Sequence, residues 1–389
     1  MAKQEGIMIV INQIKVEVDK NNFNDASRTD ALIKKDIAKK LRLKSASDVS
    51  AYKIIKKSLD ARKKPVLFYI YSVVLDMKMP LKADKKFVSD YKKEKYKFPY
   101  AGAGNVAQKS GKRPVVVGFG PGGMFSALLL ARAGFKPIVL ERGMDADSRS
   151  RDVEEYWNGG KLKLNSNVQF GEGGAGTFSD GKLNTMIKDT SGRIRCMLET
   201  FVEFGADPSI LYINKPHIGT DVLGNVVSSI RKHIIELGGE IRFNCKITDI
   251  LTIEENSYRA ISGIKIKNVK NGEEYELACD NLCLAIGHSA RDTFEMLEKR
   301  NINMTAKSFA VGLRLEHPQS FINYNAYGDS AYKMPAADYK VTYQTEAGRG
   351  VYSFCMCPGG YVVNASSEKN MLAVNGMSYS GRNSGNANS

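Results

Sequence analysis

The sequence is short of the residues from which disulfide frameworks and metal clusters are built. Its 389 residues include six cysteines and four histidines. So few cysteines in so long a chain do not form the disulfide framework of a secreted domain, so we expect reduced thiols and a cytoplasmic protein. The cysteines and histidines show no metal-ligand spacing, and no Ser-His-Asp arrangement stands out. We therefore predict no metal site.

The sequence also has no long apolar segment. The longest apolar run, 66–75, is too short to span a bilayer, which takes about 20 residues. Residues 1–6 lack the basic-then-apolar layout of a signal peptide. We expect no membrane association. The hydrophobic content of 43% is ordinary for a globular protein, and the length allows two or three domains.

Acidic residues are scarce in the first part of the chain only. Residues 1–112 hold 26 Lys+Arg and 12 Asp+Glu, whereas the remaining 277 residues hold 31 and 30. This change predicts a domain boundary near residue 112. Paired lysines with interleaved tyrosines could contact phosphates of a nucleic acid. The alternative, which we favour, is a solvated lysine-rich face, because lysines outnumber arginines 23 to 3 there and bidentate phosphate recognition prefers arginine.

A glycine motif after this boundary predicts a dinucleotide-binding site. A β-branched run ends on Gly118, and Gly118, Gly120 and Gly123 have the G-x-G-x-x-G spacing before a helical pattern. These glycines permit a tight turn, the approach of a pyrophosphate, and close packing of helix on strand. Glu141 ends the next apolar run 23 residues after Gly118, where a carboxylate meets a ribose 2′-hydroxyl. Glu141 would repel a 2′-phosphate, which argues against NADP, although Arg142 beside it leaves that alternative open.

A second glycine-rich stretch follows at 168–183. It has five glycines in eleven residues, too many for the interior of a helix or strand, and Thr177 and Ser179 add hydroxyls. Such a loop lets the backbone approach something flat or anionic. A flexible surface loop is the alternative, but apolar residues are threaded through the stretch.

The remaining patterns predict the order of elements. In the basic module we expect strands at 7–18, 51–55 and 65–77, a helix from a cap at Asp30 to Leu43, a ferredoxin-like arrangement, and a linker at 81–112. Farther on we expect a helix at 220–237, a strand at 241–250, a hairpin of 259–268 with 274–278, a strand at 282–288 and a helix at 292–299. From about 305 the β-rich segments are 309–315, 339–345, 351–355 and 361–364, and the polar last residues, 378–389, show no closing element.

Taken together, the blocks resemble the largely uncharacterised bacterial FAD-dependent dehydrogenases, flavoproteins of the glutathione-reductase-like superfamily with two dinucleotide domains. The resemblance covers nearly the whole chain and is carried by residues 58–64, 117–124, 140–143, 171–183, 285–292, 309–319 and 354–360. It implies an α/β fold in which a small basic α+β domain with its linker (1–105) precedes a Rossmann-like FAD-binding domain (106–304). An antiparallel β-rich substrate or cap domain (305–389) would be inserted into that FAD-binding fold.

The resemblance also implies FAD as cofactor, with NAD(P)H as a candidate electron donor. The cofactor-binding residues would be Gly118, Gly120, Pro121, Gly122, Gly123, Glu141, Arg142, Gly173, Gly174, Thr177, Ser179, Ile247 and Gly287. Relatives close the FAD domain with a late Gly-Asp segment that leads into a helix. Here Gly328-Asp329 has no glycine-rich helix start after it, so we expect the C-terminal part to be incomplete.

The predicted function is that of an FAD-dependent oxidoreductase acting on an unidentified small molecule. The alternatives are a flavoprotein recruited to RNA by the basic module, and a non-catalytic flavin-binding protein. No catalytic residue stands out, and the sequence predicts no oligomeric state. Cys355 and Cys357 would share one face of a strand, but a redox pair usually has C-x-x-C spacing, so we favour structural cysteines. His288 could approach the cofactor or be an ordinary loop residue.

Overall fold

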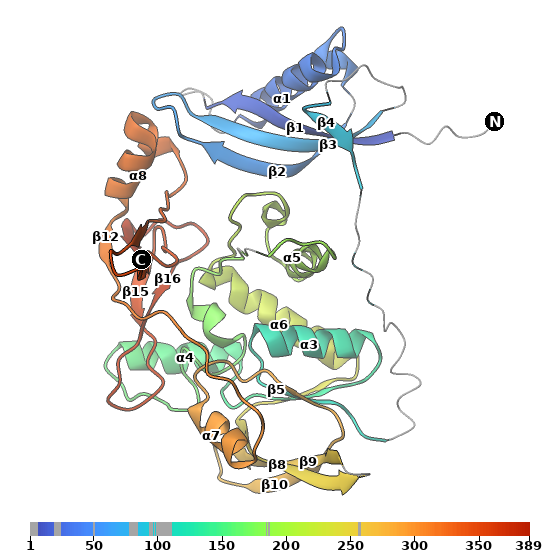
Figure 1. The fold of residues 1–389 in the computed structure, drawn as a ribbon, viewed down its shortest axis with the longest axis vertical. Coiled ribbons are helices and arrows are strands. Elements are labelled where there is room, and N and C mark those ends of the chain that lie inside the picture. The colour runs from blue at the N-terminus through green and yellow to red at the C-terminus, as the bar shows by residue number, and fades with distance from the viewer. Residues whose placement is uncertain are drawn as a thin grey trace, which may run out of the picture.

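A computed structural model shows a protein built in three parts (Figure 1). The structure describes residues 7–18, 25–49, 51–77, 85–92, 96, 98, 111–183, 185, 187–255 and 258–389. Among these residues, no helix is both long enough and apolar enough to cross a bilayer.

The N-terminal module is an antiparallel sheet with one helix. The sheet contains β1 (Ile7–Glu17), β2 (Tyr52–Asp60), β3 (Phe68–Met77) and β4 (Val88–Asp90) in the order β2-β3-β1-β4. This is the strand order of a ferredoxin-like sheet. Within the described part of the module, however, a single α-helix accompanies the sheet. β4 falls inside the predicted linker, and most of the rest of that linker lies outside the described residues.

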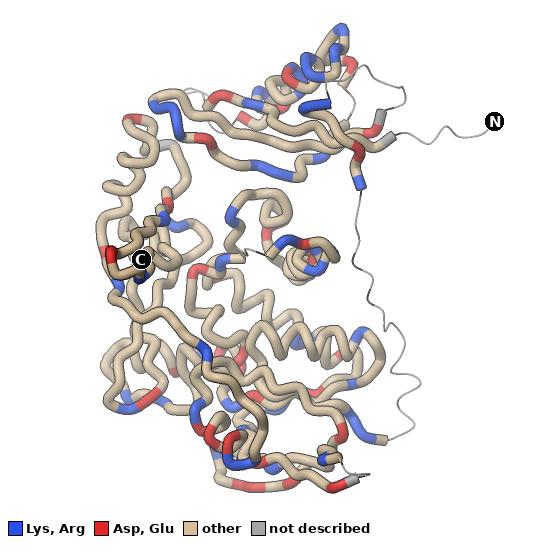
Figure 2. Tube along the Cα trace, viewed as in Figure 1, with Lys and Arg blue, Asp and Glu red and all other residues tan. Residues whose placement is uncertain are grey.

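The helix of this module, α1 (Ala26–Leu41), starts earlier than predicted. Its N-cap is Asp25, whose side chain accepts a hydrogen bond from the backbone N–H of Arg28 at 2.9 Å, so the predicted cap is wrong. Asp30 instead pairs with Lys34 one turn on, 2.8 Å away. Ile33, Ile37 and Leu41, spaced four residues apart on one face of the helix, are buried against the sheet. Figure 2 shows basic residues at several places in this module, α1 and the turn between β2 and β3 among them.

The central part is a parallel sheet of four short strands. β5 (Val115–Val117), β6 (Ile138–Leu140), β7 (Glu240–Arg242) and β11 (Leu282–Leu284) lie in the order β11-β5-β6-β7. Val116 and Val139 pack under α3 (Pro121–Arg132) and α6 (Thr220–Glu236) on one face. Side chains on the other face pack against a second sheet. Burial on both faces explains why β5 and β6 are uniformly apolar.

The second sheet is antiparallel and is inserted between β7 and β11. It consists of β8 (Cys245–Glu255), β9 (Tyr258–Asn268) and β10 (Glu274–Ala278), which confirms the predicted hairpin. The single strand predicted at 241–250 is wrong. Asn244 has a φ of 57°, and the chain turns there from the parallel sheet into the antiparallel one. Three further helices complete this part: α4 (Ala146–Trp157), α5 (Arg193–Glu203) and α7 (Arg291–Lys299).

The C-terminal part contains short strands in pairs and one further α-helix, α8 (Gln319–Tyr327). The pairs are β12 (Glu316–Pro318) with β17 (Asn386–Asn388), β13 (Thr342–Gln344) with β14 (Gly350–Tyr352), and β15 (Tyr361–Asn364) with β16 (Val374–Met377). Within the last residues, 378–389, β17 pairs with β12.

The strand predicted at 309–315 is also wrong. This segment has the alternating pattern of a strand but no regular structure, and its odd-numbered apolar side chains are exposed. Leu315 alone makes a backbone pair, with Ser389. A strand needs a partner for its N–H and C=O groups, and no other described strand lies along this segment.

The N-terminal module is attached to both other parts. The backbone of Lys57 in β2 donates to Tyr212 O at 2.7 Å and accepts from the N–H of Asn214 at 2.8 Å. At one end of the sheet, Leu67 is buried in a cluster with Ile322 and Tyr327 of the C-terminal part. Figure 1 shows β2 facing the central part and α8 beside the end of the same sheet.

Candidate nucleotide cleft

A cleft lies at the carboxyl edge of the parallel sheet. It has a volume of about 420 Å³ and is lined by the residues that follow β5, β6 and β11. In the strand order β11-β5-β6-β7 the chain leaves β5 toward β6 and later returns to the other side of β5. Such a point of reversal is where open α/β sheets bind ligands. The cleft therefore occupies the position that the fold makes available.

Two of the motif glycines are required for the backbone conformation and packing of the turn itself. Gly118 has a φ of 94°, and a β-carbon there would overlap the carbonyl group of Ala285. A β-carbon on Gly123 would overlap the carbonyl oxygen of Gly118, so this glycine lets α3 pack against the turn. Gly123 does not line the cleft. These two residues set the shape of the turn.

The other two glycines of the turn, Gly120 and Gly122, leave room for a β-carbon. A β-carbon on Gly120 would come no closer than 3.7 Å to another atom, and one on Gly122 no closer than 3.8 Å. Both residues line the cleft, and α3 begins there with no side-chain cap. The protein itself could accommodate a β-carbon at either position. A ligand group lying against the helix N-terminus would collide with that β-carbon. The free N–H groups and dipole of such a terminus favour a phosphate.

Glu141 lies at the end of β6 with its carboxylate fixed. Its Oε2 accepts the N–H of Phe119 at 2.7 Å and its Oε1 accepts the N–H of Gly143 at 2.9 Å. The side chain is 4% exposed and lines the cleft. A carboxylate oxygen has two lone pairs, so each oxygen retains one acceptor site for a ligand hydroxyl. The carboxylate is thus oriented by the turn that it faces.

The guanidinium of Arg142 is already paired within the protein, so it is not free to bind a phosphate. Its guanidinium donates to Asp292 Oδ1 at 2.7 Å and stacks over the ring of Phe170 at 4.4 Å. Lys246, from the wall opposite, contacts the other oxygen of Asp292 at 3.1 Å. Burial works to raise the pKa of Asp292, but its bonds to Arg142 and Lys246 lower that pKa below the ordinary value. The carboxylate therefore stays charged and neutralises part of both cations.

The second glycine-rich loop forms the remaining wall and is organised by a buried arginine. Arg149 in α4 is 0% exposed and donates to the carbonyl groups of Asn167, Val168 and Glu172 at 2.7–2.8 Å. A β-carbon on Gly171 would overlap the Arg149 side chain. Burial lowers the pKa of Arg149 to about 10. Arg149 was missed at the sequence level, because nothing local distinguishes it from a surface arginine on an amphipathic helix.

The structure brings most of the predicted cofactor residues together, but not all of them. Those that line the cleft are Gly118, Gly120, Pro121, Gly122, Glu141, Arg142, Gly174, Ile247 and Gly287. The hydroxyl of Thr177 instead donates to the Glu172 carbonyl, and that of Ser179 to the Gly176 carbonyl. Gly173 donates its N–H to Phe119 O. In the structure these last three residues hold the loop together and do not line the cleft.

Two other candidates are placed differently from expectation. Cys355 is exposed whereas Cys357 is buried, so the two thiols do not share a face. Burial raises the pKa of Cys357, which favours the unreactive thiol. His288 lines the cleft next to Gly287, on the segment that follows β11.

The fold defines an α/β protein with a cleft at the carboxyl edge of its parallel sheet. The chain belongs to the same family as an uncharacterised protein of Clostridium beijerinckii, with 48% identity over 377 residues, which are 95% of this chain and 68% of that protein. Residues 308–389 match a family described as "FAD-dependent protein, C-terminal domain-like", and residues 8–76 match a domain of unknown function (DUF8436).

Solved structures resemble parts of the chain. THI4 of Thermovibrio ammonificans aligns with 51% of this chain and 67% of its own, at 16% identity and a TM-score of 0.31. A flavoprotein/dehydrogenase of Cytophaga hutchinsonii aligns with 48% of this chain and 42% of its own, at 16% identity and a TM-score of 0.29. A 3-ketosteroid dehydrogenase of Rhodococcus jostii aligns with 48% of each, at 15% identity and a TM-score of 0.31.

Proposed function

We propose that this protein is an FAD-dependent oxidoreductase whose cofactor lies in the nucleotide cleft. The observation that carries the proposal is the bare backbone at Gly120 and Gly122, which lines the cleft beside the uncapped start of α3. No side chain occupies the volume beside these two glycines, so a pyrophosphate could lie there. A β-carbon at either position would take up part of the same volume. The FAD-dependent family that matches residues 308–389 supports FAD over other dinucleotides.

The residues present fit the adenosine half of FAD. Glu141 would accept hydroxyl groups of the ribose, for which its oxygens keep free lone pairs. Ile247 and Lys246, at the start of β8, would lie beside the adenine. Arg142 is already bound to Asp292, and Glu141 would repel a 2′-phosphate, so both disfavour NADP in this cleft.

The flavin supplies the redox chemistry, and the protein supplies binding and orientation. Gly174, Ala175 and Gly176 present backbone without side-chain bulk along one wall. Arg149 fixes the start of that loop through the carbonyl groups that it binds. NAD(P)H is the proposed electron donor, and the substrate is a small molecule.

The test compares Gly120→Val with a matched control. Gly120→Val should lower FAD affinity at least about tenfold, equivalent to about 1.4 kcal/mol, because the side chain would occupy the phosphate position. Gly312→Val makes the same change at an exposed glycine, where an added β-carbon would have no neighbouring atom within 4 Å. This variant should bind FAD as wild type does. FAD binding is measured by titration of flavin fluorescence, and the fold by far-UV circular dichroism.

The outcomes are separable. A folded Gly120→Val protein with undiminished flavin content would remove the assignment of the cleft. Bleaching of the bound flavin by NADH, followed by reoxidation with a substrate, would establish the oxidoreductase activity. Flavin that no donor reduces would instead leave a flavin-binding protein without this activity.

A further inference from the structure

A second and larger cavity lies where the three parts of the protein meet. Its volume is about 780 Å³, within the range of small-molecule sites, which is roughly 300–1,000 Å³. Lys57 comes from the N-terminal module, Lys182 and Lys215 come from the central part, and Arg382 comes from the C-terminal part. No single part of the chain could form this cavity alone.

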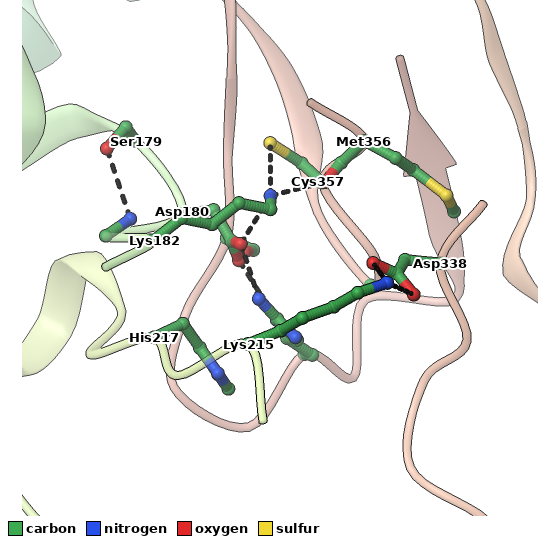
Figure 3. Close-up of polar contacts among 12 residues, drawn as sticks. Ser179, Asp180, Lys182, Lys215, His217, Asp338, Met356 and Cys357 are labelled. Atoms are coloured by element: carbon green, nitrogen blue, oxygen red, sulfur yellow. Dashed lines mark hydrogen bonds and ion pairs between the residues drawn. The ribbon is translucent and has the colours of Figure 1, made fainter. Parts of the chain in front are cut away.

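Two of these cations share one buried carboxylate. Arg382 and Lys182 both bind Asp180, which is 2% exposed (Figure 3). Lys182 Nζ also contacts the Met356 carbonyl and lies 3.9 Å from Cys357 Sγ. Burial acts to raise the pKa of Asp180, but the bonds from Arg382 and Lys182 bring it below the ordinary value. One carboxylate against two cations leaves a net positive charge at this wall.

Lys215 and its partner are neutral as a pair. Lys215 Nζ lies 2.8 Å from Asp338, and both residues line the cavity (Figure 3). His217, two residues on, contacts the Ser380 carbonyl through Nε2 at 3.1 Å, so Nε2 carries the proton and Nδ1 is free to accept. Burial and the nearby Arg382 lower the pKa of His217, which keeps the ring neutral at pH 7.

Lys57 is the cation of the cavity that lacks a carboxylate among the described residues. Its Nζ lies over the ring of Tyr69 at 4.4 Å and 5.9 Å from the ring of Tyr71. Burial lowers its pKa, because its ammonium is partly removed from water. The backbone bonds of Lys57 to Tyr212 and Asn214 fix the strand at this point. An anion in the cavity would supply the missing countercharge.

Much of the remaining lining is apolar, although Ser58, Ser209 and Asn214 also contribute to it. Leu59, Ile210, Ile213, Tyr327 and Met334 contribute to it, and Tyr69 adds an aromatic face. Inorganic phosphate would leave these walls uncovered, whereas a flat apolar group would bury them. The lining is therefore suited to a molecule with a charged end and an apolar body.

We propose that this cavity binds an organic carboxylate with a flat apolar body, recognised by Lys57 and by the positive wall of Lys182 and Arg382. The loop that carries Gly174 to Gly176 into the nucleotide cleft continues to Lys182 in this cavity. The carboxylate is thus the substrate class of the proposed oxidoreductase. That role rests on the proposed function, whereas the binding itself does not.

The experiment titrates the full chain with phenylacetate, phenylacetamide and inorganic phosphate, with binding followed by saturation-transfer NMR. Wild type should bind phenylacetate at least tenfold more tightly than either other probe. Lys57→Met should lose at least tenfold in phenylacetate affinity. Lys56→Met, the same change at the neighbouring exposed position, should bind as wild type does. Equal binding by Lys57→Met and Lys56→Met would overturn the proposal, as would equal binding of the acid and its amide.

Two further variants separate the possible explanations of the result. Lys215→Met leaves Asp338 unpaired at the cavity and should also weaken phenylacetate binding; because Lys215 is half exposed, this variant tests the proposal even if Lys57→Met does not fold. Gly120→Val should bind phenylacetate normally. If phenylacetate binds but FAD does not, the proposed carboxylate site is supported and the proposed oxidoreductase function is overturned. If FAD binds but phenylacetate does not, the carboxylate proposal alone is overturned.

Discussion

The nucleotide cleft and the inter-part cavity are built in opposite ways. The cleft is shaped by missing side chains, since Gly118, Gly120 and Gly122 bring bare backbone to the end of β5. The cavity is shaped by long charged side chains, such as Lys57 and Arg382, that reach it from distant segments. The cleft therefore depends on a few local backbone conformations, and the cavity depends on how three parts of the chain dock.

This difference predicts different responses to substitution. A β-carbon added near the cleft changes the volume that a ligand can occupy or breaks the turn itself. A lysine removed from the cavity changes its charge and leaves the backbone in place. Changes around the cleft should therefore appear in stability as well as in ligand affinity, whereas changes in the cavity should appear mainly in affinity and in pH dependence.

The largest expected effect is at Arg149, which supports the wall of the cleft. Arg149→Met should lower the free energy of unfolding by about 4 kcal/mol, because it leaves three buried carbonyl groups without their donor, each costing about 1–3 kcal/mol. Chemical denaturation measures the loss. Arg151→Met, on an exposed position of the same helix, is the control and should change stability little. A similar stability for both variants would show that the loop does not depend on Arg149.

The second effect separates two adjacent glycines of α3. Gly123→Ala should cost about 3 kcal/mol, because its β-carbon would overlap the Gly118 carbonyl and force the helix from the turn. Gly122→Ala should leave stability almost unchanged, since its β-carbon would come no closer than 3.8 Å to another atom, yet it should weaken FAD binding. Thermal unfolding and flavin titration of the two proteins test this difference. Equal melting temperatures would mean that the close packing at Gly123 is not required.

The turn around Gly118 could be predicted from sequence because its signals are consecutive. Strand, glycine spacing, helix and terminal acid follow one another within about thirty residues. The antiparallel hairpin was predicted for the same reason, from two apolar runs and an Asn-Gly turn. The segment 309–315 shows where this approach fails. Its alternating pattern satisfies one condition for a strand, but strand formation also needs a pairing partner, which local sequence does not report.

The inter-part cavity could not be predicted, because its charged residues are far apart in the chain. Lys57 and Arg382 meet only after β2 pairs with the segment at 212–214 and the C-terminal part packs on the N-terminal sheet. Local sequence likewise leaves open which way the hydroxyls of Thr177 and Ser179 face. A hydroxyl in a glycine-rich loop can face a ligand or bind its own backbone, and here both bind the backbone.

The third effect concerns the carboxylate of the cleft. Glu141→Gln should cost about 2 kcal/mol of stability, because the amide has a single oxygen for two N–H donors and its NH₂ group would face one of them. It should also weaken FAD binding, whereas phenylacetate binding in the cavity should persist. Glu203→Gln, an exposed acid on α5, serves as the control. A stable Glu141→Gln protein with normal FAD affinity would show that the charge is not needed.

The smallest effect is in the cavity and depends on pH. Burial and the adjacent Arg382 lower the pKa of His217 in the folded protein, so the unfolded chain takes up this proton more readily as the pH falls below 6.5. The unfolded state then binds more protons than the folded one, and stability must fall with decreasing pH, by at most about 1.4 kcal/mol per pH unit for one group. His217→Gln, which keeps a donor for the Ser380 carbonyl, should flatten the stability curve between pH 6.5 and the lower folded-state value. His233→Gln is the control, because that histidine lies on α6 away from the cavity. Denaturation curves across this pH range test this prediction. An identical slope in wild type and His217→Gln would mean that the ring is protonated in the folded cavity. The positive charge of the wall would then be larger than it is with a neutral ring.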